Sequence, residues 1–176
     1  CADAGRAGQC VFREDTLVDM VRSGTSKCPH CSTAFSGFAG PQPTGTMPVS
    51  VEPRLQFDDG RGGGGGGAIV IDYSFDDGVQ GDMHDAPGQR YYGTHRRCFL
   101  PLSDDGRAAL ALLRRAFELG KIFRVGQSVT TGREHQTVWA GIHHKTSPSG
   151  GAQNHGYPDP GWFDRLKSEC AAASVM

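Results

Sequence analysis

The sequence has no long hydrophobic run and almost no net charge, and these two absences exclude several classes of protein. Its longest apolar stretch is far below the roughly 20 residues that a membrane-spanning helix needs, so we expect a soluble protein without a membrane partner. A formal net charge of -1 gives no general field that would attract nucleic acid, so we expect no nucleic-acid partner. Any anionic ligand must therefore be bound by local groups.

Glycine and proline are abundant instead, with 26 Gly and 10 Pro in 176 residues, which predicts much loop and turn. The length suits one domain, or a domain of about 130 residues with a small module. Six consecutive glycines, Gly62 to Gly67, predict a flexible hairpin insertion; they lack the spaced pattern of a phosphate-binding loop. The chain begins at Cys1 with no charged-then-apolar leader, and we expect a fragment of a longer protein or a processed product.

The cysteines are unevenly distributed, since four of the six lie in the first 31 residues. A Cys-x-x-Cys pair with cysteines upstream is typical of a structural zinc site. We therefore predict a partial RING-like module over residues 1–35, containing a short helix near residues 14–21 and binding at most one zinc ion. Its ligands would be Cys1, Cys10, Cys28 and Cys31. The alternative is a degenerate module with ordinary buried or free thiols.

Residues 36–45 are predicted to form a linker, and residues 46–176 a second domain of the α+β class. Branched and aromatic residues predict strands at 47–57 and 68–75. Ser103 is a candidate cap for a helix that ends at Gly120. Residues 122–126 and 137–142 are predicted to form a hairpin. We expect a mixed α/β domain with an antiparallel sheet packed by helices.

The last helix is predicted to begin with Asp159 as its N-cap and Pro160 at its first position. Trp162, Leu166 and Glu169 then follow at helical spacing and share one side of the helix. A carboxylate beside a large aromatic side chain is suited to act as a general base. Glu169 is thus a candidate catalytic residue.

Three of the seven histidines, His143, His144 and His155, lie within thirteen residues in a loop-rich stretch. Imidazole exchanges protons near neutral pH, so the cluster is a candidate site for acid–base chemistry. Because His143 and His144 are adjacent at a strand end, their side chains point to opposite faces and one of them is structural. Two alternatives are a zinc site made by His143, His155 and Glu169, and a plain turn at residues 155–160.

Residues 28–173 resemble the C-terminal part of the Deltex family of RING-type ubiquitin ligases. The segments that carry the resemblance are Cys28-Pro29-His30-Cys31, Gln42-Pro43-Thr44-Gly45-Thr46-Met47, Gly78-Val79-Gln80-Gly81, Cys98-Phe99-Leu100-Pro101, Ile122-Phe123-Arg124-Val125-Gly126, Thr130-Thr131-Gly132, Val138-Trp139, Ile142-His143-His144-Lys145-Thr146 and His155-Gly156-Tyr157-Pro158-Asp159-Pro160. The resemblance implies a RING that recruits a ubiquitin-conjugating enzyme, followed by a Deltex C-terminal domain that binds NAD or ADP-ribose.

It further implies transfer of ubiquitin to an ADP-ribose hydroxyl or to protein lysines, ADP-ribosylated proteins as partners, a role in Notch signalling, and a cytoplasmic or nuclear location. By position, His155 and Glu169 match the catalytic residues of the family, and His143 matches a pocket histidine. Gly126, Gln127 and Ser128 would lie along the nucleotide. Trp139 and Tyr157 are candidates for stacking on the ligand, with a place in the core as their alternative. Val129 stands where relatives usually carry a serine.

Two functions of different classes follow. In the first, the chain is a ubiquitin ligase in which Glu169 takes the proton of the attacking hydroxyl and His155 orients that hydroxyl. In the second, the domain only reads ADP-ribose on partners and transfers nothing.

Overall fold

The structure, a computed structural model, describes residues 2–3, 6–7, 12–22, 28–30, 40–57 and 65–175. At the N-terminus, β1 (Ala2–Asp3) pairs antiparallel with β2 (Arg6–Ala7), and α1 covers Glu14–Arg22, where a helix was predicted. Cys1, Cys10 and Cys31 lie outside the described residues, whereas Cys28 is described and buried. Within the described residues, no three His, Cys, Asp or Glu side chains are placed to hold a metal ion. The RING-like zinc site remains a prediction.

The second region is built on an antiparallel sheet of three strands in the order β3-β4-β7, namely β3 (Val49–Phe57), β4 (Gly65–Phe75) and β7 (Thr94–Pro101). Both strands expected before residue 76 are confirmed. Gly65 to Gly67 belong to β4, and the preceding glycines of the predicted insertion lie outside the described residues. The central strand β4 is buried from Ala68 to Ile71, as its unbroken apolar run requires.

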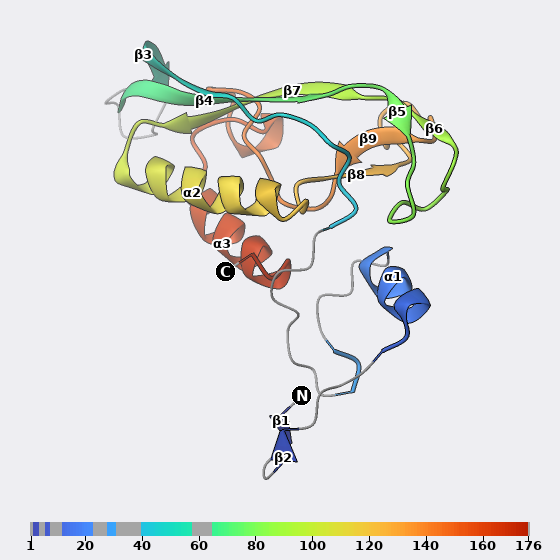
Figure 1. The fold of residues 1–176 in the computed structure, drawn as a ribbon. Helices are drawn as coiled ribbons and strands as arrows, with labels where there is room; N and C mark the ends of the chain where they lie inside the picture. Colours follow the sequence, from blue (N-terminus) through green and yellow to red (C-terminus); the bar gives the residue numbers. More distant parts are fainter. Residues whose placement is uncertain are drawn as a thin grey trace.

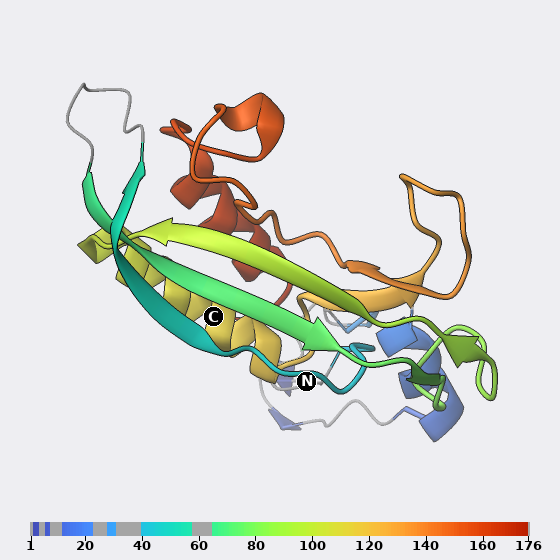
Figure 2. The same cartoon turned by 90° about the horizontal axis from the view of Figure 1, so that it is seen from above.

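Two helices pack below this sheet (Figure 1). The first, α2 (Asp104–Glu118), begins at the predicted cap, where the Ser103 hydroxyl accepts the Gly106 N–H at 3.2 Å. The second, α3 (Trp162–Ala172), contacts α2. Seen from above, the three strands lie side by side over α2, with the start of α3 and the segment that precedes it to one side and the C-terminus within the area of the sheet (Figure 2). The core between these layers includes Tyr73, Leu113 and Leu166, all fully buried.

Two short hairpins and a connecting segment complete the region. The pair β5 (Gly78–Val79) and β6 (Arg90–Tyr91) is antiparallel, and so is the predicted hairpin of β8 (Phe123–Gly126) and β9 (Gln136–Trp139). A 3-10 turn, η1 (Ala152–Asn154), precedes α3. The Gln42 side chain accepts the N–H groups of Ile122 and Phe123 at 3.2 and 3.0 Å, so residues of the expected linker contact this region.

The start of α3 differs from the prediction. The helix begins at Trp162 with Gly161 as its N-cap, so Asp159 does not cap it and Pro160 is not its first residue. The reason is that the Asp159 carboxylate is engaged elsewhere, with Lys145 at 2.6 Å and with Arg165. Two cations are stronger partners for a carboxylate than a single backbone N–H.

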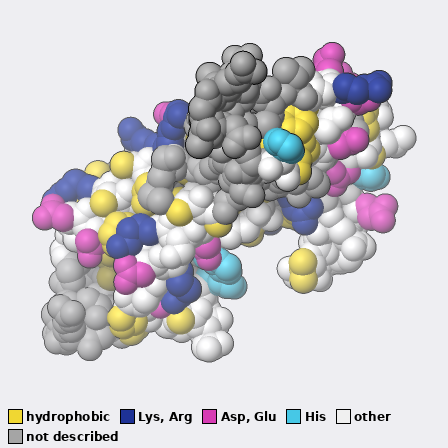
Figure 3. Space-filling model, turned by 90° about the horizontal axis from the view of Figure 1, so that it is seen from below, with side chains coloured by type: hydrophobic (Ala, Val, Ile, Leu, Met, Phe, Trp, Pro, Cys, Tyr) yellow, Lys and Arg dark blue, Asp and Glu magenta, His cyan; other side chains and the backbone are white. Residues whose placement is uncertain are grey.

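On the face shown in Figure 3, acidic and basic side chains of the described residues are interspersed. None of the described helices combines the length and the apolar character needed to cross a membrane.

Candidate functional site

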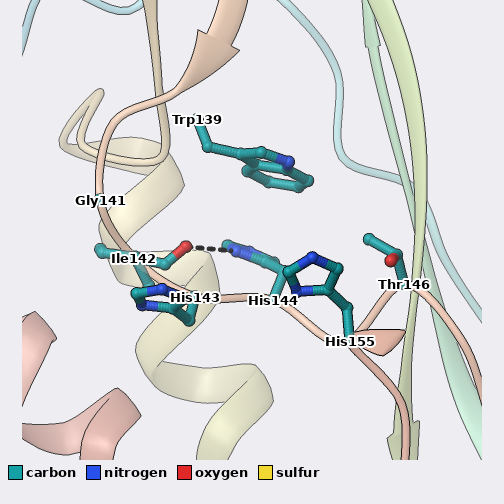
Figure 4. A pocket seen from close by; sticks show the side chains of 7 residues that line it. All are labelled: Trp139, Gly141, Ile142, His143, His144, Thr146 and His155. Carbon is teal, nitrogen blue, oxygen red and sulfur yellow. Dashed lines mark hydrogen bonds between the residues drawn. The ribbon is translucent and has the colours of Figure 1, made fainter. Parts of the chain in front are cut away.

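A cavity of about 300 Å³ lies where β9 ends and the following segment passes beneath Trp139 (Figure 4). Gly141 adopts a φ of 124°, which side chains rarely allow, and the chain turns there. In the view of Figure 4, His143 lies on one side of His144, and His155 and Thr146 lie on the other. The lining residues are Trp139, Gly141, Ile142, His143, His144, Thr146 and His155. The structure therefore brings all three clustered histidines to one cavity.

One wall is a stack of three rings, with Trp139 between Phe123 at 4.3 Å and His144 at 4.4 Å, measured between ring centroids. His144 is buried and its tautomer is fixed by its partners. The Ile142 carbonyl, 2.8 Å from His144 Nδ1, can only accept, so Nδ1 carries the proton and Nε2 accepts from the Tyr73 hydroxyl at 2.9 Å. Burial lowers the pKa of His144 to about 4, so it is neutral at pH 7. His144 is the structural member of the cluster.

His143, by contrast, has an exposed side chain whose position is set by α3. Its backbone N–H donates to Glu169 Oε2 at 2.8 Å, and its ring Nδ1 lies 2.5 Å from Glu169 Oε1. The buried Trp162 indole donates to the His143 carbonyl at 3.3 Å. Trp162 and Glu169 are seven residues apart and thus lie on one side of the helix, as the spacing predicted. Two side chains of one helix therefore hold His143 at three points.

His155 reaches the cavity from the left-handed turn that follows η1, with a φ of 51°. Its carbonyl accepts the Thr146 N–H at 3.0 Å, which joins this turn to the segment carrying His143. The next residue is also fixed, because the buried Lys145 ammonium donates to the Gly156 carbonyl at 2.8 Å and pairs with Asp159. Burial raises the pKa of Asp159, but the hydrogen bonds from Arg165 and Lys145 outweigh it and the net pKa is lowered. An ion pair thus anchors the His155 turn.

Other predicted site residues lie outside this cavity. Glu169 does not line the cavity. Its side chain is only 23% exposed and contacts His143, which is one of the lining residues. Tyr157 is buried against Phe57 and Trp162 and donates its hydroxyl to the Phe99 carbonyl at 3.1 Å. Burial raises the pKa of Tyr157 well above its usual range, so this phenol keeps its proton. Its position is that of a core residue.

Gly126 and Gln127 line a second cavity of about 240 Å³ at the far end of the β8–β9 hairpin. Phe123 stacks on Trp139 of the first cavity and lies three residues before Gly126 on β8. At roughly 3.3 Å per strand residue, the two ends of β8 are about 10 Å apart. Here the buried Gln80 side chain accepts the Ala86 N–H and donates to His135 Nδ1 at 3.0 Å. Ser128 shapes the adjoining turn, with its hydroxyl accepting the Thr131 N–H. Only an elongated ligand could touch both cavities.

Some lining residues were not predicted from the sequence. Thr146 could have been predicted, because it follows His144 by two residues and lies on the same side of an extended segment. No local sequence pattern indicates Gln80 and His135, since these residues are 55 positions apart in the sequence and meet only in the fold.

Comparison with known proteins supplies the family. Residues 39–175 match the model of the Deltex C-terminal domain. The human protein named "Probable E3 ubiquitin-protein ligase DTX3" is 42% identical over 149 residues, which cover 84% of this chain and 42% of that protein. The human "E3 ubiquitin-protein ligase DTX1" is 35% identical over 179 residues, covering 97% of this chain and 28% of that protein. The Xenopus laevis protein of the same name is 35% identical over 182 residues, covering 98% and 28%.

The chain belongs to the Deltex family. It spans less than half the length of these curated relatives.

Proposed function

We propose that the histidine-lined cavity binds the ADP-ribose portion of NAD or of an ADP-ribosylated protein, and that the chain promotes transfer of ubiquitin from a conjugating enzyme to ADP-ribose or to protein targets. The observation that carries this proposal is the meeting of three imidazoles and one indole around a single cavity in a Deltex C-terminal domain. The relatives are named as ubiquitin ligases, and the ligase activity of this chain is part of the proposal. A role in Notch signalling would follow from the same family membership.

The size and chemistry of the cavity suit one half of such a ligand. A volume of about 300 Å³ is at the lower end of the range of about 300–1,000 Å³ for pockets that bury most of a small molecule. A ribose with its attached group would fill it, while the remainder of the ligand would extend over the surface, with Gly126, Gln127 and Ser128 along its path. The Trp139 ring offers an apolar face, and the exposed imidazoles of His143 and His155 offer partners for ribose hydroxyls.

The transfer needs no nucleophilic cysteine from this chain. A ribose hydroxyl oxygen would attack the carbonyl carbon of the thioester that joins ubiquitin's C-terminus to the conjugating enzyme. An ester bond forms, the carbon–sulfur bond breaks, and the thiolate leaves while the hydroxyl proton passes to a base on this chain. Burial raises the pKa of Cys98 to about 12 and of Cys170 to about 11, which makes both thiols poor nucleophiles at pH 7. In this reaction the chain supplies position and a base.

The conjugating enzyme would be recruited by the N-terminal module. Cys1, Cys10, Cys28 and Cys31 would bind one zinc ion as four thiolates, which is the donor set of a closed structural site. Removing zinc with a chelator should then abolish transfer but leave ADP-ribose binding unchanged, because the cavity is built from residues 139–155.

One observation favours the second candidate, a reader of ADP-ribose without transfer activity. Both oxygens of Glu169 accept hydrogen bonds from His143, and Glu169 is not among the residues that line the cavity, so this carboxylate does not face a bound hydroxyl directly. A ligase would need Glu169 to turn from His143 toward the ligand before it could take the proton.

Two experiments test these functions. Calorimetry with ADP-ribose tests the cavity that both share: His143→Ala and Trp139→Ala should weaken binding, whereas His95→Gln on β7 should not. Absence of binding by the unaltered chain would refute both functions. Incubation with activating enzyme, conjugating enzyme, ubiquitin, ATP and ADP-ribose then separates them, since only a ligase forms a ubiquitin–ADP-ribose product that mass spectrometry detects.

A further inference from the structure

We infer that Lys121 is the lysine at which this chain itself accepts ubiquitin, so that the proposed ligase modifies its own chain beside β8 when no other acceptor is bound. This inference rests on the proposed function, because the ubiquitin thioester must be presented to the histidine-lined cavity. Three observations carry it: the small number of lysines, the free ammonium group of Lys121, and the position of Lys121 next to the cavity.

Lysines are rare in this chain, which has four of them against fourteen arginines. Arginine is no alternative acceptor, because its guanidinium stays protonated. Lys27 lies outside the described residues. Lys145 is buried and its ammonium is held in the ion pair with Asp159, so it does not meet an acyl donor. Two described lysines, Lys121 and Lys167, remain as acceptors.

Lys167 is exposed on α3, but its ammonium has two partners. It lies 2.6 Å from Asp164 Oδ1 and 4.8 Å from the centre of the Phe163 ring. The carboxylate and the face of the ring both stabilise the charged form of the amine. A protonated amine has no lone pair with which to attack a carbonyl carbon. Its surroundings therefore make Lys167 the weaker nucleophile of the two.

Lys121 has no such partner. In the part of the chain that the structure describes, no hydrogen bond or ion pair forms at Lys121 Nζ, and solvent reaches this nitrogen. The stem of the side chain passes close to Gly40, where an added Cβ would meet Lys121 Cδ at 3.1 Å. This partial burial disfavours the charged form and lowers the pKa of Lys121. Desolvation without a counter-ion is one of the ways in which proteins activate a lysine as a nucleophile.

The position of Lys121 follows from the pairing of β8 with β9. The Ala140 N–H donates to the Ile122 carbonyl at 2.9 Å, which extends this antiparallel pair by one residue. Lys121 and Gly141 are the next residues on the two segments, and Gly141 lines the histidine-lined cavity. Paired segments lie about 4.8 Å apart, a gap that the flexible four-carbon stem of a lysine can span. A thioester presented to the cavity is therefore close to Lys121.

The reaction is the transfer of the ubiquitin acyl group to nitrogen instead of oxygen. The neutral Lys121 amine attacks the carbonyl carbon of the thioester, an isopeptide bond forms, and the carbon–sulfur bond breaks. The proton that the nitrogen loses passes to the departing thiolate of the conjugating enzyme. The products are ubiquitin on Lys121 and a free thiol. Because a bound ADP-ribose hydroxyl would attack the same carbon, Lys121 and ADP-ribose compete for one thioester.

Acetyl coenzyme A, a small acyl thioester, tests the reactivity of Lys121 without a conjugating enzyme. After incubation with the full chain at pH 7.5, peptide mapping by mass spectrometry should find Lys121 acetylated faster than Lys167. The rate at Lys121 should also level off at a lower pH, because it stops rising once the amine is neutral. In urea, where the fold is lost, the difference should disappear. Faster acetylation of Lys167 in the folded chain, or equal pH profiles, would overturn the inference.

Incubation with activating enzyme, conjugating enzyme, ubiquitin and ATP, but without ADP-ribose, tests the transfer itself. Peptide mapping should place the isopeptide-linked ubiquitin on Lys121. Lys121→Arg keeps the charge but removes the nucleophile, and should lower self-modification by on the order of tenfold or more. The matched control Lys167→Arg should keep it within about twofold, because it loses only an exposed ion pair. Urea unfolding of both variants checks that they fold.

Added ADP-ribose tests the competition. It should lower the modification of Lys121 in the unaltered chain as the ubiquitin–ADP-ribose product appears. Lys121→Arg should form that product undiminished, because the ligand site contains no part of Lys121. A Lys121→Arg variant that folds but forms less of this product would show that Lys121 acts in the ligand site and would overturn its role as an acceptor.

The two levels of the proposal fail in different ways. If ubiquitin–ADP-ribose forms but the chain carries ubiquitin only at Lys27 or Lys167, or at no lysine, the ligase function stands and the inference is wrong. If neither ubiquitin–ADP-ribose nor modified chain forms, the ligase function fails and the acceptor role of Lys121 fails with it.

Discussion

Buried, neutral His144 should make the protein less stable in mild acid. Burial is the main reason that the pKa of His144 falls from 6.5 to about 4 in the folded protein. The hydrogen bond to Ile142 raises this pKa, and the nearby His143 lowers it further. Between these two values the unfolded chain binds a proton that the folded chain excludes. The stabilising contribution is therefore complete above pH 6.5, falls as pH decreases from 6.5 to 4, and levels off below 4.

The magnitude follows from the two pKa values. With 6.5 unfolded and about 4 folded, linkage gives a loss of about 2 kcal/mol between pH 7.5 and pH 5. The indole of Trp139, stacked at 4.4 Å, would attract the imidazolium and offset about 0.5–1 kcal/mol of this loss. We therefore expect a net loss of at least about 1 kcal/mol that depends on His144.

Urea unfolding at pH 7.5, 6 and 5 measures this loss, comparing the unaltered chain with His144→Gln and with His30→Gln, an exposed control. His144→Gln should be less stable at pH 7.5 but should lose less stability on acidification, whereas the control should follow the unaltered chain. An NMR titration of the His144 ring checks the same point without a variant. Parallel stability curves for all three proteins, or a His144 ring that titrates near pH 6.5, would contradict a buried, neutral His144.

Three further predictions concern the walls of the cavity. Lys145→Met leaves Asp159 and the Gly156 carbonyl without their buried cation and should lower the free energy of unfolding by about 3 kcal/mol, as measured by urea unfolding. The control Lys167→Met breaks an exposed pair with Asp164 and should cost less than about 1 kcal/mol. Gly156→Ala would place a Cβ 1.8 Å from the Ser149 carbonyl oxygen, so the His155 turn must shift and calorimetry should show weakened ADP-ribose binding, unlike Gly81→Ala, which meets nothing within 4 Å. Trp139→Ala removes a half-buried ring from the stack and should cost about 2 kcal/mol in thermal unfolding, less than the roughly 3–5 kcal/mol of a fully buried aromatic side chain. Equal stability of Lys145→Met and Lys167→Met, equal ADP-ribose affinity of Gly156→Ala and Gly81→Ala, or equal stability of Trp139→Ala and the unaltered chain would contradict these contacts.

Local signals predicted much of the fold. Ser103 caps α2 because a hydroxyl can accept a first-turn N–H wherever the chain enters a helix, and the β8–β9 hairpin follows from two short apolar runs around a turn. The strand β7 was not predicted, because His95, Arg96 and Arg97 interrupt its apolar pattern. Arg97 is compatible with the strand only because it pairs with Asp72, directly opposite on β4. The start of α3 was misplaced for a similar reason, since the partners of Asp159 are distant in sequence.

In the candidate site, too, features with a local sequence signal were predicted, and features that depend on distant contacts were not. Helical spacing alone placed Glu169 beside Trp162, and strand alternation alone separated His143 from His144. The contact between Glu169 and His143 joins positions 26 residues apart on different elements, and no local pattern contains it. The second cavity likewise depends on Gln80 meeting His135 across 55 residues. Spacing within one element is visible in a sequence, whereas contacts between elements depend on how they pack.

An NMR titration of the chain with ADP-ribose would show whether the cavity between Trp139 and His155 binds this ligand. The largest shifts should appear at the backbone amides of residues 141–146, at His155 and at the Trp139 indole N–H, and shifts at Gly126 and Gln127 should occur only together with these. No shifts, or shifts confined to the second cavity around Gln80 and His135, would contradict this binding.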